Sequence, residues 1–396
     1  MRVLVINDFV RRGGAEEVYR MSVDVLRARN DVTVETFDEH ALGGVENIRR
    51  ARAWSPSTAR ALVALLDRFR PQRILVHNYH NLLSSAILPV LARYKRRSGC
   101  GLYITAHDYH LVFHNPSLQV YSRGRGQPLA LDRLHGGRRL IPIASPRGIL
   151  HDVVKKVHWH VVNALFDPLG LFDEILCPSP FMRDLIARFG RTRATLLSNP
   201  IDSSLISRAP KPARGARLDL AFVGRIEADK GLAEFLALMA ESAGDAIGSL
   251  TVYGEGSERG GLEKRHADLV ENGRLRFAGR LDHAALFAEL PTHDALVLPS
   301  VWVENAPLVI VEAAVLGLPV LVNDIGSLST FGDEIGNKIL YRNSADDFSR
   351  AIGALRAHLG DENRRYDWSR YTVDCYASSL YAALGIDEHV SRAPAR

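Results

Sequence analysis

Cysteine is scarce in this chain of 396 residues: Cys100, Cys177 and Cys375 lie far apart and form no CxxC pair. Such spacing indicates neither a disulfide framework nor a structural zinc site, and a reducing cytoplasm fits it best. No apolar run approaches the ~18 residues that a membrane-spanning helix needs. The first apolar run is interrupted at Asp8, too early for the apolar region of a signal peptide. We therefore expect a cytoplasmic protein whose membrane contact, if it has one, is peripheral on the inner face of the membrane.

Charge of one sign is also limited, since the formal net charge is +5. This excess suits phosphates or an anionic membrane surface, but it is too small to indicate nucleic acid. The sequence has no zinc-finger spacing and no Arg/Lys block interleaved with aromatic residues. Apolar residues make up 46% of the chain, which is enough for two domains with substantial cores.

Short apolar runs alternate with helical stretches along the whole chain, which predicts two Rossmann-like, doubly wound parallel sheets facing each other across a cleft. We expect domains at 1–200 and 201–365, a helix at 366–385 that packs back on the first domain, and a disordered tail at 386–396. The expected strands are 3–6, 32–37, 74–77, 102–105, 172–177, 194–198, 218–223, 250–253, 275–277, 295–298 and a last one at Leu340. The expected helices include 56–69, 82–97, 149–165, 179–189 and 366–384.

The stretch 298–324 contains the strongest candidates for ligand-binding residues. Pro307 suits a first helical position, and the helix after it is apolar except for Glu312, a carboxylate that is costly to bury without a partner. Glu304 lies eight residues earlier, at the carboxyl end of a strand, where open α/β sheets bind ligands. The first amides of the helix, those of Leu308 and Val309, suit an anion. Two carboxylates beside an anion site suggest a ligand with both phosphate and hydroxyl groups.

Three motifs together resemble the retaining glycosyltransferases of the GT-B fold, family 4. The first is Pro-Ser-x-x-x-Glu-Asn-x-Pro-Leu-x-x-x-Glu-Ala, which contains Glu304 and Glu312. The second is Gly-Arg-x-x-x-x-Lys-Gly, with Arg225 and Lys230, and the third is Thr-x-His-Asp-Tyr, with His107. The matches extend over nearly the whole chain, and they imply a metal-independent enzyme without a cofactor, because no Asp-x-Asp motif accompanies the nucleotide pocket.

The resemblance also assigns roles to single residues. It implies that Arg225 and Lys230 grip the diphosphate of a nucleotide sugar, that Glu312 binds ribose hydroxyls, and that Glu304 binds hydroxyls of the donor sugar. His107 would reach the reacting carbon of that sugar. The further donor-binding residues are Gly13, Gly14, Tyr253, Gly254, Arg280, Leu281, Asn305, Ala306, Leu308 and Val309. Asp108 and Tyr109 are the candidates for the acceptor, and Gly13–Gly14 taken alone could equally be a tight turn.

Two features have no role in this scheme. His110 and His114 are unassigned, and a metal site formed by them is disfavoured. The stretch 149–165 has an apolar stripe at helical spacing, which favours a core-facing helix with a solvated basic face. The rival interpretation is a basic amphipathic surface that meets lipid head groups, for which Arg49, Arg50, Arg52 and Arg60 are other candidates. The stripe comprises Leu150, Val153, Val154, Val157, Val161 and Leu165.

The sequence thus predicts a retaining glycosyltransferase that moves a sugar from a nucleotide-diphosphate sugar to a hydroxyl of a glycan or lipid-linked acceptor, in cell-envelope polysaccharide biosynthesis. Two alternatives stay open: a nucleotide-sugar epimerase of the same fold, and a catalytically silent nucleotide-sugar-binding protein. A dehydrogenase fits poorly, because the chain has no GxGxxG fingerprint.

Overall fold

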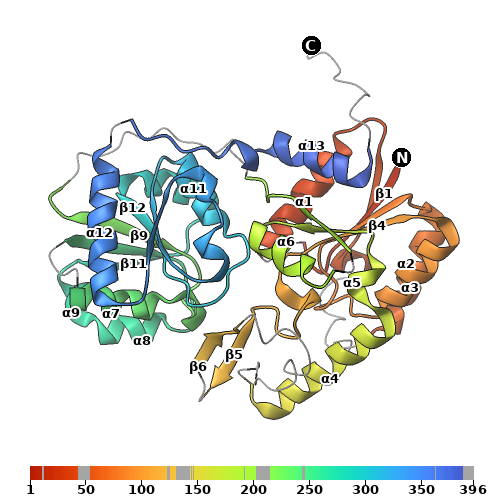
Figure 1. Ribbon diagram of the computed structural model, residues 1–396, viewed down its shortest axis with the longest axis horizontal. Coiled ribbons are helices and arrows are strands. Elements are labelled where there is room, and N and C mark those ends of the chain that lie inside the picture. The colour runs from red at the N-terminus through yellow and green to blue at the C-terminus, as the bar shows by residue number, and fades with distance from the viewer. Residues whose placement is uncertain are drawn as a thin grey trace. The chain divides into compact units, whose positions relative to one another are not determined.

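The structure is a computed structural model, and it divides into two compact units (Figure 1). Unit 1 comprises Met1–Tyr121, Leu129–Pro200 and Val373–Arg396, and unit 2 comprises Ser122–Pro128 and Ile201–Thr372. The residues described are 1–10, 13–42, 54–122, 125–130, 143, 145, 147–190, 192–201, 215–242, 246–361 and 363–386. Arg49, Arg50, Arg52 and the expected tail from residue 387 lie outside them.

Unit 1 is built on six parallel strands in the order β2-β1-β3-β4-β7-β8. The four inner strands are short and mostly apolar, which suits a sheet that is covered on both faces. The edge strands β2 and β8 carry more polar residues and are less buried. The strands are β1 (Arg2–Ile6), β2 (Thr33–Phe37), β3 (Arg73–Val76), β4 (Gly101–Thr105), β7 (Glu174–Cys177) and β8 (Arg193–Leu196). The helices are α1 (Gly14–Arg27), α2 (Pro56–Phe69), α3 (Ile87–Ser98), α4 (Ile149–Phe166), α5 (Pro168–Leu171), α6 (Pro180–Ala187) and α13 (Val373–Leu384). A separate hairpin joins β5 (Gln119–Ser122) and β6 (Arg125–Pro128).

The last helix, α13, packs on α1 within unit 1. The Tyr376 hydroxyl lies 2.6 Å from the Ser22 hydroxyl, and the Tyr381 hydroxyl donates to the Val25 carbonyl at 2.8 Å. Leu380 and Leu384 join the apolar cluster that covers one face of the sheet. The C-terminal helix is therefore an integral part of this core.

Unit 2 repeats the plan with the parallel strand order β11-β10-β9-β12-β13-β14. This confirms the predicted fold class of two Rossmann-like α/β domains. The strands are β9 (Leu218–Val223), β10 (Ile247–Tyr253), β11 (Leu275–Gly279), β12 (Ala295–Leu298), β13 (Val320–Asn323) and β14 (Lys338–Tyr341). The helices are α7 (Leu232–Ser242), α8 (Arg259–Arg265), α9 (Ala267–Glu271), α10 (His283–Glu289), α11 (Leu308–Val315) and α12 (Ala345–Gly360).

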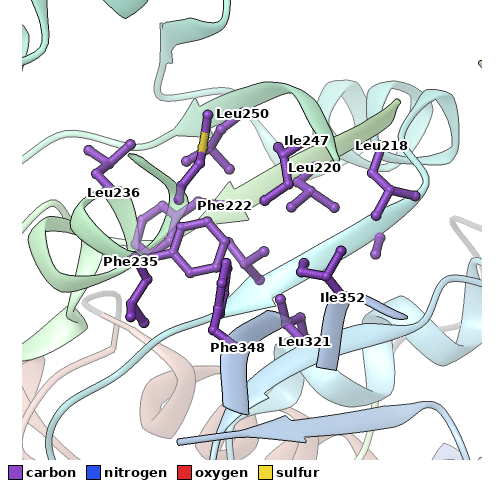
Figure 2. Close-up of a cluster of buried hydrophobic side chains, with 14 of the residues drawn as sticks. Leu218, Leu220, Phe222, Phe235, Leu236, Ile247, Leu250, Leu321, Phe348 and Ile352 are labelled. Atoms are coloured by element: carbon purple, nitrogen blue, oxygen red, sulfur yellow. The ribbon is translucent and has the colours of Figure 1, made fainter. Parts of the chain in front are cut away.

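Two apolar layers sandwich the sheet of unit 2. On one face, Leu220 and Phe222 of β9 pack with Phe235 of α7 and Phe348 of α12 (Figure 2). On the other face, Ala221 of β9 belongs to a second cluster that contains the inward side of α11. Because alternate residues of a strand point to opposite faces, both layers follow from one continuous apolar run.

Several predicted boundaries are corrected. The helix expected from residue 82 begins at Ile87, because the amides of Leu82 and Leu83 donate to the Asp8 carboxylate and Ser84 has a φ of 65°. The final helix begins at Val373 rather than at residue 366. Pro307 is the N-cap of α11 and not its first helical residue.

The expectation that α4 turns its apolar stripe to the core is wrong. Leu150 is 79% exposed and Leu165 is 67% exposed, whereas Asp152 and Trp159 are buried. Polar contacts decide the orientation: the Trp159 indole donates to the His110 carbonyl at 2.7 Å, and Asp152 pairs with Lys156 at 2.5 Å. The polar side of this helix is therefore the inner one.

Gly231, on the loop after β9, lies directly against the backbone at Pro299. Gly231 has a φ of 69°, and a Cβ there would lie 2.0 Å from the Pro299 carbonyl oxygen. We expect Gly231→Ala to lower the free energy of unfolding by at least about 2 kcal/mol, since left-handed strain and a backbone clash add. Urea denaturation measures this change in the free energy of unfolding. The matched control is Gly260→Ala on α8, where a Cβ meets nothing within 4 Å. Equal effects of the two substitutions would contradict the packing.

Candidate functional site

The loops that leave the strands of unit 2 are tied together by their backbones at the carboxyl edge of the sheet. Gly224 donates to the Tyr253 carbonyl at 3.0 Å, and Gly254 donates to the Gly279 carbonyl at 2.9 Å. The amide of Val301 donates to the Asp229 carbonyl at 3.0 Å. These bonds place the loops after β9, β10, β11 and β12 side by side, which is where an open α/β sheet binds its ligand.

Lys230 and Glu304, predicted from separate motifs, meet at this edge. The Lys230 Nζ lies 2.6 Å from Glu304 Oε1, and both side chains are largely buried, with 18% and 11% exposed. The same oxygen accepts from the Ser300 hydroxyl at 2.8 Å and from the Trp302 indole at 2.7 Å. The Lys230 ammonium also lies 4.9 Å from the centre of the Trp302 ring, a cation–π contact.

This arrangement holds a cation and an anion in fixed positions. The Ser327 hydroxyl donates to the Glu304 carbonyl, which fixes the backbone of that residue too. A lysine ammonium has three N–H donors, whereas a carboxylate can only accept. Phosphate oxygens therefore suit Lys230, and sugar hydroxyls suit Glu304.

Arg225 contributes a second, less constrained cation. It follows β9 by two residues, its side chain is 67% exposed, and its Nη2 lies 3.9 Å from Asp229 Oδ2. A pair at that distance and exposure contributes little to stability. The planar guanidinium is therefore able to turn toward a phosphate, which it can bind with two hydrogen bonds.

Helix α11 starts at the same edge. The amides of Leu308 and Val309 belong to its first turn, which has no preceding helical carbonyls to bond. Glu312 is half-buried, and its Oε1 lies 3.6 Å from His283 Nε2 of α10. Residue spacing does not predict this partner, because His283 belongs to a different helix. Asn305 and Ala306 are half-buried in the loop between Glu304 and the helix.

The residues expected around a base and ribose occupy different environments. Tyr253 is 3% exposed and packs in the core, with its ring against His293 at 5.8 Å. Gly254 has a φ of 152°, and a Cβ there would lie 1.8 Å from the Gly224 carbonyl oxygen. Arg280 is exposed and Leu281 is half-buried. At this position a ligand would therefore meet backbone and loop residues rather than the tyrosine ring.

Gly13 and Gly14 begin α1 in unit 1. Gly13 is an extended N-cap without a side-chain cap, and a Cβ on Gly14 would meet nothing within 4 Å. Neither close packing nor backbone strain thus requires glycine at both positions. Glu16 and Glu17 lie in the same first turn, and their carboxylates reduce its attraction for an anion.

His107 contacts a second histidine, His77, which belongs to none of the three motifs. His77 Nδ1 lies 2.8 Å from His107 Nε2, and the two rings stack with centroids 5.1 Å apart. His77 Nε2 is buried without a hydrogen-bond partner in the described structure. A buried N–H without an acceptor is rare, so His77 donates through Nδ1 and His107 Nε2 accepts. The hydrogen of His107 is then on Nδ1.

Asp108 organises the neighbouring loop. Its Oδ1 accepts from the His110 amide at 2.8 Å, and its Oδ2 lies 3.3 Å from His80 Nε2. Burial raises the pKa of this carboxyl, but the charge of His80 and these hydrogen bonds lower it to about 2. Burial lowers the pKa of His80, yet the carboxylates of Asp108 and Asp8 raise it overall. Tyr109, the other acceptor candidate, is 1% exposed.

Asp8 is a third residue that sequence reasoning missed. Its carboxylate, fully buried after β1, accepts from the amides of Asn81, Leu82 and Leu83 at 2.8–3.0 Å. These bonds fix the loop that carries His80. Its place at a strand's carboxyl end was the signal that could have found it. In the part of the chain that the structure describes, no three His, Cys, Asp or Glu side chains are arranged to hold a metal ion.

Buried histidines make stability depend on pH. Burial lowers the pKa of His77 and His110, and lowers that of His107 and His114 to about 4. Unfolded histidines titrate near 6.5, so between about pH 6.5 and 4 the unfolded chain binds more protons than the folded chain. We therefore expect the free energy of unfolding to fall as the pH falls through this range, by on the order of 2 kcal/mol at pH 5 for His107 alone.

Urea denaturation at pH 7.5, 6 and 5 checks this expectation. The substitution His107→Gln should make the slope against pH shallower, whereas His40→Gln, at an exposed histidine of unit 1, should leave it unchanged. A free energy of unfolding that is constant or rises toward pH 5 would contradict the neutral, buried state of these rings.

Comparison with known proteins finds relatives for part of the chain. Residues 205–372 match the family model described as glycosyl transferases group 1. Glycogen synthase of Mycobacterium tuberculosis (strain CDC 1551 / Oshkosh) is 34% identical over 230 residues, which are 53% of this chain and 54% of that protein. The chain thus spans about half the length of the curated relatives it matches. No helix in the described part of the chain is long and apolar enough to cross a membrane.

Solved structures share the fold over almost the whole chain. The apo form of the lipopolysaccharide outer core galactosyltransferase WaaB has a TM-score of 0.62 at 15% identity and covers 97% of this chain and 99% of its own. Anabaena Alr3699/HepE in complex with UDP-glucose has a TM-score of 0.57 at 14% identity, with coverage of 97% and 99%. This chain therefore has the GT-B fold, and its residues 205–372 match the family model of the glycosyl transferases group 1.

Proposed function

We propose that this protein is a retaining glycosyltransferase that takes its sugar from a nucleotide-diphosphate sugar, with unit 2 as the donor-binding unit and unit 1 as the acceptor-binding unit. The observation that carries the proposal is the Lys230–Glu304 pair at the carboxyl edge of the unit 2 sheet. A phosphate-binding cation and a hydroxyl-binding carboxylate side by side match a ligand in which a diphosphate is joined to a sugar. The relative Alr3699/HepE, solved with UDP-glucose, supports this class of donor.

The site must stabilise the negative charge that develops as the nucleoside diphosphate departs. Negative charge grows on the leaving oxygen while the sugar becomes cationic, and preorganised donors aimed at that charge are the largest expected contribution. Lys230 and Arg225 supply the cations, and the amides of Leu308 and Val309 add two dipoles. These groups take the place of a metal ion in the proposed reaction.

Glu304 binds the donor sugar and Glu312 binds the ribose in this proposal. Glu304 Oε1 already accepts from Lys230, Ser300 and Trp302. Three donors on this oxygen, one of them a cation, withdraw negative charge from the carboxylate as a whole. The group is therefore a weaker nucleophile through either oxygen, which argues against a covalent glycosyl–Glu304 intermediate. We therefore favour retention through the leaving phosphate oxygen, which takes the proton of the attacking hydroxyl on the same face of the sugar.

In this proposal unit 1 contributes His107 and Asp108 to the binding of acceptor hydroxyls, whereas Tyr109, which is 1% exposed, supports their loop from the core. His107 is neutral at pH 7, since burial lowers its pKa to about 4, and it can donate a hydrogen bond from Nδ1. A neutral donor suits a sugar hydroxyl, because it adds no charge beside the developing cation. His77 acts as a positioning residue that fixes this tautomer, and Asp8 fixes the neighbouring loop.

A glycan or a lipid-linked glycan is the proposed acceptor, in the assembly of a cell-envelope polysaccharide. The relatives act on such molecules by name, one in glycogen synthesis and one on the lipopolysaccharide outer core. A thermal-shift screen of UDP-, GDP- and dTDP-sugars identifies the donor. Incubating that donor without acceptor then separates the alternatives, since an epimerase converts it and a silent binder leaves it intact.

Arg225 provides the sharpest catalytic test. We expect Arg225→Ala to lower kcat/KM by about 10²–10³, the usual cost of losing one preorganised donor, while the thermal midpoint barely changes. The matched control is Arg350→Ala on α12, whose side chain is 61% exposed and pairs with Asp347 three residues away. A stability loss as large as the activity loss would show that Arg225 is structural.

Glu312 is tested by binding alone. Replacing the carboxylate by an amide in Glu312→Gln removes a charged acceptor, so the Kd for the nucleoside diphosphate should rise about 10-fold or more in calorimetry. Glu271→Gln, at an exposed position of α9, serves as the control. An unchanged Kd for Glu312→Gln would remove this residue from the ribose site.

A further inference from the structure

Trp302 contacts both members of the Lys230–Glu304 pair. Its indole N–H donates to Glu304 Oε1 at 2.7 Å, and the Lys230 ammonium lies 4.9 Å from the centre of its ring. The edge of an aromatic ring is positive and its face is negative, so each charge meets the part of the indole that attracts it. One uncharged side chain thus stabilises both the cation and the anion of the candidate site.

Backbone contacts on both sides of Trp302 hold it in place. Its carbonyl accepts from the Glu304 amide at 3.1 Å, which closes a tight turn over three residues. Two residues before it, the Ser300 carbonyl accepts from Asn323 Nδ2 at 3.0 Å. Trp302 itself is half-buried. The loop therefore fixes the direction from which the indole N–H reaches the carboxylate.

The donors to Glu304 Oε1 respond differently to a bound nucleotide sugar. A diphosphate attracts the Lys230 ammonium, so the bond from Lys230 to the carboxylate weakens when the ligand binds. The Ser300 hydroxyl rotates and can also accept, so it does not fix a direction. The indole N–H of Trp302 can only donate, and it lies in the plane of a ring that the loop holds. Trp302 is therefore the contact that keeps Glu304 in one orientation while the site is occupied.

We propose that Trp302 is a positioning residue that aims Glu304 at a hydroxyl of the donor sugar and so sets how sharply the site discriminates between sugars. The inference rests on the proposed function, in which Glu304 binds that sugar. A carboxylate held in one direction accepts from a hydroxyl of matching direction, whereas a deoxy or epimeric sugar leaves it without this partner. The indole N–H then contributes to binding of the sugar and not to binding of the diphosphate.

The substitution Trp302→Phe separates the two contacts of the indole, because a phenyl ring still offers its face to Lys230 but has no N–H. Calorimetry compares UDP with UDP-glucose, GDP with GDP-mannose, and dTDP with dTDP-glucose. We expect the Kd for the nucleotide sugar to rise about fivefold or more, while the Kd for the matching nucleoside diphosphate changes by less than about twofold. The matched control is Trp368→Phe, at another half-buried tryptophan, which packs against the core of unit 2.

A second comparison shows whether Trp302 acts through Glu304. In a Glu304→Ala background, Trp302→Phe should raise the Kd for the nucleotide sugar by less than about twofold, because the carboxylate that it positions is gone. A further loss of about fivefold in that background would mean that the indole binds the sugar directly, and it would overturn the positioning role.

A loss confined to the nucleotide sugar, with an unchanged thermal midpoint, supports the proposal. The proposal is overturned if Trp302→Phe raises both Kd values alike, if it changes neither, or if Trp368→Phe has the same effect. Nucleotide binding by the unchanged protein would in each of these cases still support the proposed function. If the unchanged protein binds none of these nucleotides, the proposed function fails and this inference fails with it.

Discussion

The ion pair between Lys230 and Glu304 is the interaction on which the candidate site depends. Its two side chains are largely buried at 2.6 Å, in surroundings where an unpaired charge is expensive. Each charge therefore keeps the other in place, and Ser300 and Trp302 complete the arrangement. A donor molecule that offers a phosphate to Lys230 and hydroxyls to Glu304 can replace part of this pairing without leaving either charge unpaired. The site is thus prepared for a ligand with both kinds of group.

Rigid loops make this pairing possible. Gly231 and Gly254 allow the exits of β9 and β10 to approach neighbouring backbone more closely than any Cβ permits. In unit 1, Asp8 performs a similar task with a carboxylate that binds three backbone amides. The two units therefore use different means, close backbone approach and a buried acceptor, to fix polar side chains at the carboxyl ends of their strands.

Sequence reasoning reached the strands and the main charged residues because their signals are local. The run 218–223 and the run 295–298 are short, apolar and bounded by turn residues, and they match β9 and β12 residue for residue. The residues that these charged groups contact were harder to predict from the sequence. His77 meets His107 across two strands, and His283 reaches Glu312 from another helix. Residue spacing within one segment cannot reveal such pairs, because the two residues come from different segments.

Helix α4 shows a different limit. Its periodicity gave the correct helix and the correct apolar stripe, but periodicity does not say which side of a helix faces the core. The contacts of Asp152 with His114 and of Trp159 with His110 decide that orientation, and both partners lie about 40 to 50 residues earlier in the chain. The same contacts leave the aliphatic side chains of α4 exposed.

Calorimetric comparison of a nucleoside diphosphate with its nucleoside tests the central claim most directly. If Lys230 and Arg225 grip the diphosphate, the diphosphate should bind at least 100-fold more tightly than the nucleoside, and the Arg225→Ala/Lys230→Met double variant should lose most of that difference. Equal affinities for the two ligands, or a difference that survives the double variant, would contradict the account.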